Sequence, residues 1–229
     1  MRRHTRSRLT VALAAAVSLL VPAGLAHADP ASGPAAEAGG PIVHQVPDVP
    51  TTIDGESVDP SSITEYNGRP LYMAALPGGS SKGRLAVFTD GAEFERFVSA
   101  RGGPADLLGR EPQEVTVEQA AAFAAADDPS ALQELVTIHE HAGPGGAALG
   151  IPVGTGVTNL QDWDLSCFLF FCNNWNDETS AATAGGFSGM SLFEHRDFGR
   201  SVLWVNGGTS FPDLTVYGWN DRTSSFASF

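Results

Sequence analysis

The sequence predicts a chain with two folded parts, an α+β unit followed by an all-β sandwich. Between residues 52 and 142, strand-like runs alternate with amphipathic helical patterns. From residue 158 to Phe229, helix-forming runs disappear and short apolar runs alternate with Asn, Asp, Gly and Ser, which is typical of compact all-β domains. The Gly-rich residues 143–157 lie between these two regions and are interpreted as an interdomain linker.

The α+β unit is expected to begin with a β-hairpin. Asn67-Gly68 favours a type I′ turn, in which both central residues need positive φ. Ile63–Tyr66 and Leu71–Leu76 flank this turn and are predicted to be its strands. Arg84–Thr89 is expected to form a third strand.

Helix-start signals follow the third strand. Asp90 and Thr116 each stand three residues before a Glu or Gln, the spacing of a capping box. They predict one helix that starts after Asp90 and a second over residues 116–126. The next segment is ambiguous: a third helix starting at Pro129 and a β-branched strand over Glu134–His141 both fit the pattern.

The first 28 residues are typical of a secretory signal peptide. Four Arg residues within the first eight positions precede the apolar run Leu9–Val21 and the small-residue site Ala26-His27-Ala28. A membrane-spanning helix needs about 20 apolar residues, so this run is too short to be an anchor. We therefore expect cleavage before Asp29 and an extracellular protein. Residues 29–51, rich in Ala, Gly and Pro, are expected to be a disordered leader.

The charge of the mature chain restricts its partners. Removal of residues 1–28 leaves nine basic and 26 acidic residues, a net charge of −17. Such a polyanion repels phosphate backbones and anionic lipids, so we expect neither nucleic acid nor, after signal cleavage, a membrane as a partner. Divalent cations are compatible with this charge.

The chain contains two cysteines, Cys167 and Cys172. In an oxidising compartment, two cysteines separated by four residues are predicted to form a local disulfide. Because the closed loop is small, the bond is expected to shape a hairpin-like loop more than to stabilise the whole fold.

Two six-residue segments repeat near the C-terminus. Trp175–Ser180 and Trp219–Ser224 agree at five of six positions and begin 44 residues apart, which indicates two related supersecondary units. Their Asn, Asp and Ser oxygens are hard donors of the kind that Ca²⁺ prefers. The same residues also form ordinary turns in which each side chain bonds to its own backbone. Residue chemistry alone leaves both interpretations open.

The second repeat resembles the calcium-binding pattern of the βγ-crystallin family. Asn220–Ser225 matches that pattern, which is Asn/Asp, Asn/Asp, any residue, any residue, Ser/Thr, Ser. Upstream, Leu192–Gly199 is similar to the first Greek-key strand and folded hairpin of the family, and the spacing between the two motifs suits one Greek key. Ala181 replaces the final Ser in the first loop. The resemblance is good over Trp175–Phe229. It extends to 158–229 if the residues before Trp175 are included, although these lack the aromatic signature of the family's first strand.

The resemblance implies a Greek-key sandwich with Ca²⁺ bound between two paired loops. In this family, each ion takes side-chain oxygens and main-chain carbonyls from both loops. The implied side-chain ligands are Asn176, Asp177, Ser180, Asn220, Asp221 and Ser224. The carbonyl groups of Glu178, Arg222 and Glu194 are further candidates.

No catalytic pattern accompanies these loops, so we expect a protein that is not an enzyme. A nucleophile elbow is absent. His139-Glu140-His141 offers two histidines without a third ligand and is interpreted as a solvated segment end. The tryptophans are interpreted as core or hairpin aromatics: Trp163, Trp175, Trp204 and Trp219.

We therefore expect a secreted calcium-binding module with a structural or interaction role. The resemblance also allows an alternative, a secreted metalloprotease inhibitor or a killer-toxin-like protein that acts on an extracellular target. In that alternative, the segment Cys167–Cys172, which contains three Phe residues, would contact the target protein.

Overall fold

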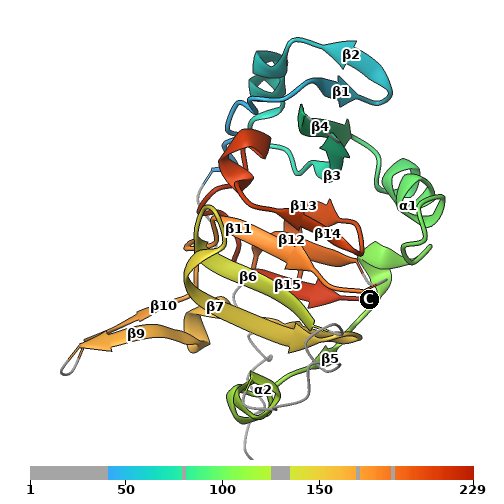
Figure 1. Cartoon of the computed structure of the whole chain (residues 1–229). Helices are drawn as coiled ribbons and strands as arrows, with labels where there is room; N and C mark the ends of the chain where they lie inside the picture. Colours follow the sequence, from blue (N-terminus) through green and yellow to red (C-terminus); the bar gives the residue numbers. More distant parts are fainter. Residues whose placement is uncertain (1–40, 79–80, 125–134, 169–170, 187–188) are drawn as a thin grey trace, which may run out of the picture. The chain divides into compact units, whose positions relative to one another are not determined.

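Two similar four-stranded units form the C-terminal half of the chain (Figure 1). The computed structural model describes residues 41–78, 81–124, 135–168, 171–186 and 189–229. The strands of the first unit are β6 (Leu135–His141), β7 (Gly145–Pro152), β8 (Thr155–Val157) and β11 (Ala181–Ala184). Those of the second are β12 (Met190–His195), β13 (Gly199–Val205), β14 (Thr209–Phe211) and β15 (Ser225–Ser228).

Each unit gives its third strand to the sheet of the other. One sheet has the order β14-β11-β6-β7, and the other contains the run β13-β12-β15-β8. β8 of the first unit therefore pairs with β15, and β14 of the second unit pairs with β11. Two Greek keys that exchange strands in this way must fold together, because neither sheet is complete without both keys.

The second sheet is buried on both faces. In β13, Leu203 and Val205 belong to the core between the two sheets, whereas Val202 and Trp204 belong to a second core on the opposite face. The helix α1 (Gly91–Ser99) contributes Phe94 and Val98 to that second core. Burial on both faces explains why β13 reads as a continuous apolar run rather than an alternating one.

Residues 51–114 extend this sheet instead of forming a separate domain. β3 (Tyr72–Gly78) pairs in parallel with β13, and the sheet continues through β4 (Ser81–Phe88), β1 (Thr51–Ile53) and β2 (Glu56–Val58). At the other edge, β5 (Gln113–Glu114) pairs in parallel with β8. Residues 39–229 form one compact unit. The predicted separate α+β domain over residues 52–142 is therefore wrong, although its strands and helices exist.

The predicted linker over residues 143–157 is also wrong. This segment forms β7 and β8, and β7 pairs with β6 along its length. Its glycines suggested flexibility, but Gly143, Gly146 and Gly154 adopt positive φ at turns where the chain reverses. The Greek-key part therefore begins at β6, not at residue 158. Of the two alternatives for Glu134–His141, the strand is correct; a helix start at Pro129 lies outside the described residues.

Both predicted helix caps are confirmed. Asp90 accepts a hydrogen bond from the Glu93 amide at the start of α1 (2.9 Å). Thr116 and Gln119 exchange two hydrogen bonds, of 2.9 and 3.3 Å, at the start of α2 (Val117–Ala124). The helical turns are η1 (Pro60–Tyr66), η2 (Leu107–Gly109), η3 (Leu160–Asp162) and η4 (Leu214–Tyr217).

The hairpin predicted at Asn67-Gly68 is wrong. Residues 60–66 form η1, which Asp59 caps by accepting a hydrogen bond from the Ser61 amide (2.9 Å). Asn67 has φ −52°, so the turn is not type I′. The local Asp-Pro-Ser start signal outweighed the turn dipeptide that follows it.

The predicted signal peptide, its cleavage site and residues 29–40 of the leader lie outside the described residues. Residues 41–50 of the predicted disordered leader lie against the folded unit, where His44 and Val49 are buried. The leader prediction is wrong for this segment. Among residues whose placement is described, no helix is long and apolar enough to cross a membrane.

Candidate metal centre

The two Greek keys repeat each other residue by residue through their first three strands. Glu140 and Glu194 are 54 residues apart, and each lies at a bulge where the register of the first hairpin shifts. At the same spacing, Gly146 and Arg200 both have positive φ (72° and 63°), and so do Gly154 and Gly208 (79° and 67°). The first key is therefore a complete structural counterpart of the second.

An insertion separates the keys further along the chain. Trp175 and Trp219 are 44 residues apart, so the first key is ten residues longer than the second between its third strand and its loop. The additional residues fall in a hairpin of β9 (Asp164–Phe168) and β10 (Phe171–Asn174), a two-stranded sheet of its own that extends away from the other sheets in Figure 1. The predicted Cys167–Cys172 disulfide closes this hairpin.

Equivalent hydrogen bonds place the two repeated loops. The Ser180 amide donates to the His139 carbonyl and the Ser224 amide to the Phe193 carbonyl, both at 2.9 Å. Asp177 and Asp221 occupy the left-handed region, with φ of 56° and 52°. Asp tolerates this conformation better than most residues, and it turns each carboxylate toward the opposite loop.

The loops bind each other reciprocally. The Asp177 amide donates to the Thr223 carbonyl (3.0 Å), and the Asp221 amide donates to the Thr179 carbonyl (3.2 Å). Between the side chains, Ser224 Oγ lies 3.4 Å from Asp177 Oδ1, and Ser180 Oγ lies 3.4 Å from Asp221 Oδ1. We call Asp177 with Ser224 pair A, and Asp221 with Ser180 pair B.

The oxygen spacing in both pairs fits a shared calcium ion. Two oxygens that each lie about 2.4 Å from one Ca²⁺ and subtend about 90° at it are about 3.4 Å apart. Pairs A and B have this separation, and each takes one oxygen from either loop. Four of the six side chains expected as ligands are thus brought together in two equivalent places.

Solved βγ-crystallin domains match part of this structure. The chain is similar to a βγ-crystallin from Ciona intestinalis (18% identity, TM-score 0.33, covering 42% of this chain and 99% of that one). It is also similar to domains from Clostridium beijerinckii (18%, 0.31, 42% and 97%) and Flavobacterium johnsoniae (21%, 0.32, 41% and 92%). No known protein family profile and no curated protein matches the chain.

The C-terminal half has the two-key sandwich architecture that the βγ-crystallin resemblance implied. The two exchanged Greek keys and their paired loops are the basis of this assignment, and the resemblance predicted from the sequence is confirmed.

The two asparagines of the repeated loops orient the aspartates rather than face the pairs. Asn176 Nδ2 donates to Asp177 Oδ2 (2.7 Å), and Asn220 Nδ2 donates to Asp221 Oδ2 (2.6 Å). Each amide therefore holds one carboxylate oxygen and leaves the other, Oδ1, directed at the serine across the loops.

Bulged strands add candidate carbonyl ligands. A β-bulge leaves one residue out of the ladder, and Glu194 occupies that position in β12. Glu140 occupies it in β6, a candidate that the sequence prediction missed. The signal was the repeated Glu-His dipeptide, Glu140-His141 and Glu194-His195, 54 residues apart. His139-Glu140-His141 is thus the first-key counterpart of the recognised strand rather than a solvated segment end.

Carboxylates lie close together around pair A. Partial burial raises the pKa of the Asp177 carboxyl, and the nearby Asp221 and Glu194 carboxylates raise it further, against hydrogen bonds from Ser224 and Asn176. Glu194 Oε2 is buried and has no hydrogen-bond partner among the described residues. A bound cation would offset the repulsion between these carboxylates.

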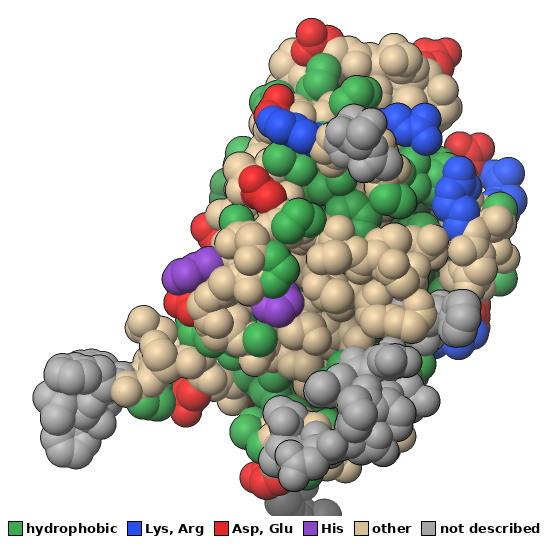
Figure 2. All heavy atoms as spheres, in the orientation of Figure 1, with side chains coloured by type: hydrophobic (Ala, Val, Ile, Leu, Met, Phe, Trp, Pro, Cys, Tyr) green, Lys and Arg blue, Asp and Glu red, His purple; other side chains and the backbone are tan. Residues whose placement is uncertain are grey.

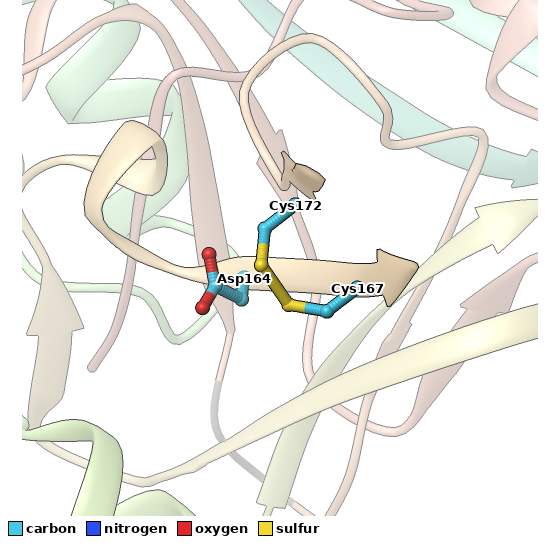
Figure 3. A group of neighbouring side chains, drawn as sticks. All are labelled: Asp164, Cys167 and Cys172. Atoms are coloured by element: carbon cyan, nitrogen blue, oxygen red, sulfur yellow. A yellow bond between two sulfur atoms is a disulfide. The ribbon is translucent and has the colours of Figure 1, made fainter. Parts of the chain in front are cut away.

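Among the described residues, one other cluster brings acidic and thiol groups together. Asp164, Cys167 and Cys172 have ligand atoms within 4.8 Å of one another (Figure 3). Both sulfur atoms are bonded in the disulfide, which leaves one carboxylate as a donor. On the face seen in Figure 2, acidic side chains are scattered rather than gathered. The charges on this face therefore do not single out a site, and the paired loops are the candidate.

Proposed function

We propose that this protein is an exported calcium-binding module in which Ca²⁺ fastens the two Greek keys to each other. The reciprocal Asp–Ser pairs carry this proposal, because each places two hard oxygens from different keys at a spacing suited to one ion. The role is one of binding and structure rather than catalysis.

Calcium would act chiefly on stability. Extracellular calcium modules often have dissociation constants of about 10⁻⁴ to 10⁻³ M. An ion present at 100 times its dissociation constant adds about 2.7 kcal/mol to the free energy of unfolding. That is a large share of the 5–15 kcal/mol or so typical of a folded domain.

The direct experiment is thermal unfolding of the full chain in millimolar calcium and in chelator, together with calorimetric titration. We expect a higher melting temperature with calcium and two binding events. Magnesium is the matched control, because it demands a smaller octahedral site and gives up its water reluctantly. A truncated fragment beginning near Gly150 is unsuitable, since it would lack β6 and most of β7. Identical melting with calcium and with chelator would refute calcium binding while leaving the fold unchanged.

Export has its own test. The sequence features of residues 1–28 support processing before Asp29. Mass spectrometry of chain recovered from culture medium should find Asp29, or a close neighbour, as the first residue. An intact Met1 chain retained in the cytosol would contradict export.

A second candidate function is inhibition of an extracellular protease through the β9–β10 hairpin. In support, this hairpin is an insertion outside both main sheets, is closed by a disulfide and exposes both cysteines. The sequence between the cysteines is Phe-Leu-Phe-Phe. A covalently closed loop loses little conformational entropy on binding, which favours tight contact with a target.

To test this candidate, the chain would be assayed against secreted metalloproteases, with Cys167→Ser/Cys172→Ser as the matched variant. Inhibition that is lost in the variant would support the hairpin as the contact. The assay would be repeated with inhibitor chain freed of calcium by chelator and with a protease that does not need calcium. Inhibition that persists there would show that the hairpin acts without calcium at the loops. Absence of inhibition across the panel would remove the candidate.

A further inference from the structure

A segment from outside the Greek keys lies across the second calcium loop. This segment, Pro41–Asp48, is called the strap below. Gln45 Nε2 donates to the Asn220 carbonyl (3.1 Å), and the Asp48 amide donates to the Val216 carbonyl (2.7 Å). The contact is close: a Cβ added at Gly218 would lie 2.5 Å from the Gln45 carbonyl oxygen, so only glycine fits there.

The strap is fixed on its other side to the extension of the sheet. The His44 amide donates to Asn67 Oδ1 (2.8 Å), and the Gly68 amide donates to the Ile42 carbonyl (2.9 Å). Lys82 on β4 forms an ion pair with Asp48. The second calcium loop is therefore connected through the strap to the β1–β4 region.

Arg222 contacts the second loop, the strap and β12 at once. Its side chain is buried, with 7% of its surface exposed. Nη1 donates to the Gly218 carbonyl and Nη2 to Glu194 Oε1, both at 2.9 Å, and the guanidinium lies 4.8 Å from the Trp219 ring centre. Nη2 also lies 3.5 Å from His44 Nδ1.

His44 is oriented to accept from Arg222. Its Nε2 lies 2.9 Å from the Arg69 carbonyl, which can only accept, so Nε2 carries the proton and Nδ1 presents its lone pair. The imidazole is thus neutral in this arrangement. It joins the strap to Arg222 from one side while Glu194 binds Arg222 from the other.

The first loop has no counterpart of this arrangement. Glu178 takes the place of Arg222 and is exposed. Thr223 Oγ1 accepts a hydrogen bond from Trp219 Nε1 (3.1 Å), whereas Thr179 Oγ1 is buried without a partner in the described structure. The second loop is bound to the strap by the Gln45–Asn220 hydrogen bond. The first loop is anchored elsewhere: the Trp175 amide donates to the Trp163 carbonyl (3.0 Å), and the Leu214 amide donates to the Ser180 carbonyl (2.9 Å).

We propose that the strap, acting through Gln45, His44 and Arg222, is a positioning element that pre-forms the second loop for calcium. This inference rests on the proposed calcium function. The second loop supplies Ser224 to pair A and Asp221 to pair B, so its conformation affects both ions. A loop that is already ordered loses less entropy when the ion binds, and its affinity is correspondingly higher.

The coupling must act in both directions. If the strap raises calcium affinity, calcium stabilises the docked strap by the same free energy. Calcium at the two loops would therefore protect the amides of His44 and Asp48 and, through them, the attachment of the β1–β4 region. The strap makes the metal centre a regulator of a part of the chain that contributes no ligand.

The experiment compares the full chain with Gln45→Ala and Arg222→Met. Gln45→Ala removes one exposed side-chain hydrogen bond and should fold normally; Arg222→Met removes all the hydrogen bonds of the Arg222 side chain. Val46→Ala is the matched control, because Val46 is on the strap but 51% exposed. Calorimetric titration should give calcium affinity lower by about threefold in Gln45→Ala and by about tenfold or more in Arg222→Met, in line with the loss of one neutral or several charge-assisted hydrogen bonds.

Hydrogen exchange of the calcium-free chain supplies a readout that does not depend on the metal. In both variants, amides of residues 218–224 should exchange faster, and more so than those of 175–180, while Val46→Ala leaves both unchanged. Unaltered exchange and unaltered affinity in Arg222→Met would overturn the strap's role even if the wild-type chain binds calcium. If the wild-type chain binds no calcium but its second loop still loosens in the variants, calcium function falls and positioning of the loop stands.

Discussion

The two repeated loops have almost the same sequence but different surroundings. They agree at five of six positions and form reciprocal hydrogen bonds with each other. The second loop is additionally bound by the strap, by the buried Arg222 and by a Trp219–Thr223 hydrogen bond. The first loop follows the β9–β10 hairpin and has the exposed Glu178 in place of Arg222. Two nearly equal motifs therefore have different contacts.

The residue after each motif shows a second difference. Ser225 Oγ donates to the His195 carbonyl (2.6 Å) and accepts from the Phe198 amide (3.1 Å), which fastens the folded hairpin of the second key. Ala181 holds the equivalent place in the first key and offers no such bond. The final Ser of the motif thus supports the hairpin beside the site rather than a ligand position.

The largest expected effect distinguishes the two tryptophans. Trp219→Ala should lower the free energy of unfolding by about 3–5 kcal/mol, since it removes a fully buried ring together with its bond to Thr223. Trp175→Ala should cost less, because Trp175 lines a pocket beside β7 and is not bonded to Thr179 Oγ1. Urea denaturation of both variants in chelator measures the difference. Equal losses of unfolding free energy in the two variants would mean that the different surroundings of the loops do not affect stability.

Replacing the serine of each pair tests the proposed calcium sites. Ser224→Arg should remove a donor from pair A, place a cation there and abolish the calcium shift from that site, up to about 2.7 kcal/mol at 100 times the dissociation constant. Ser180→Arg should do the same for pair B. Its loss should be the smaller one, because Ala181 replaces the final Ser of the motif in the first loop. Calorimetric titration should then count one remaining site in each variant. Two sites in either variant would contradict its assigned pair.

Ser225→Ala should destabilise the second key by about 1–3 kcal/mol, because the partly buried His195 carbonyl and Phe198 amide both lose their partner. The reverse change in the first key, Ala181→Ser, is the matched control and should give no comparable gain, since that hairpin is built without this bond. Thermal melting in chelator is the measurement. If the two substitutions change the melting temperature by the same amount, the Ser225 hydrogen bonds do not explain the difference between the two keys.

The smallest effect concerns the charge of Asp177. Burial, together with the Asp221 and Glu194 carboxylates, raises the pKa of its carboxyl in the folded chain, so ionisation opposes folding when calcium is absent. Asp177→Asn should therefore melt slightly higher than wild type in chelator at pH 7, while losing calcium at pair A. The advantage should shrink as pH falls through the raised pKa of the folded chain. It should vanish below the unfolded-state pKa of about 3.9, where the wild-type carboxyl is neutral in both states. Asp221→Asn is the comparison, and a lower chelator melting temperature for Asp177→Asn would contradict this account.

Local chemistry explains which predictions from the sequence succeeded. Four of the predicted features depend on residues only a few positions apart, so the sequence determined them directly. They are the helix caps at Asp90 and Thr116, the Cys167–Cys172 disulfide and the strand at Leu192. The Asp and Ser residues of the paired loops were also identified from the motif. The chemistry of hard oxygen donors in tight turns is local and survives in any tertiary context.

Only the tertiary structure revealed the first Greek key. β6 and β7 carry His139 and a run of Gly and Ala where the second key carries Phe193 and large apolar residues, so their pattern was indistinguishable from a segment end and a linker. The exchange of β8 and β14, the pairing of β3 with β13 and the docking of the strap all join residues far apart in sequence. Strand pairing depends on the shape and burial of the partner surface rather than on intrinsic preference, and for that reason the tertiary structure alone decided these contacts.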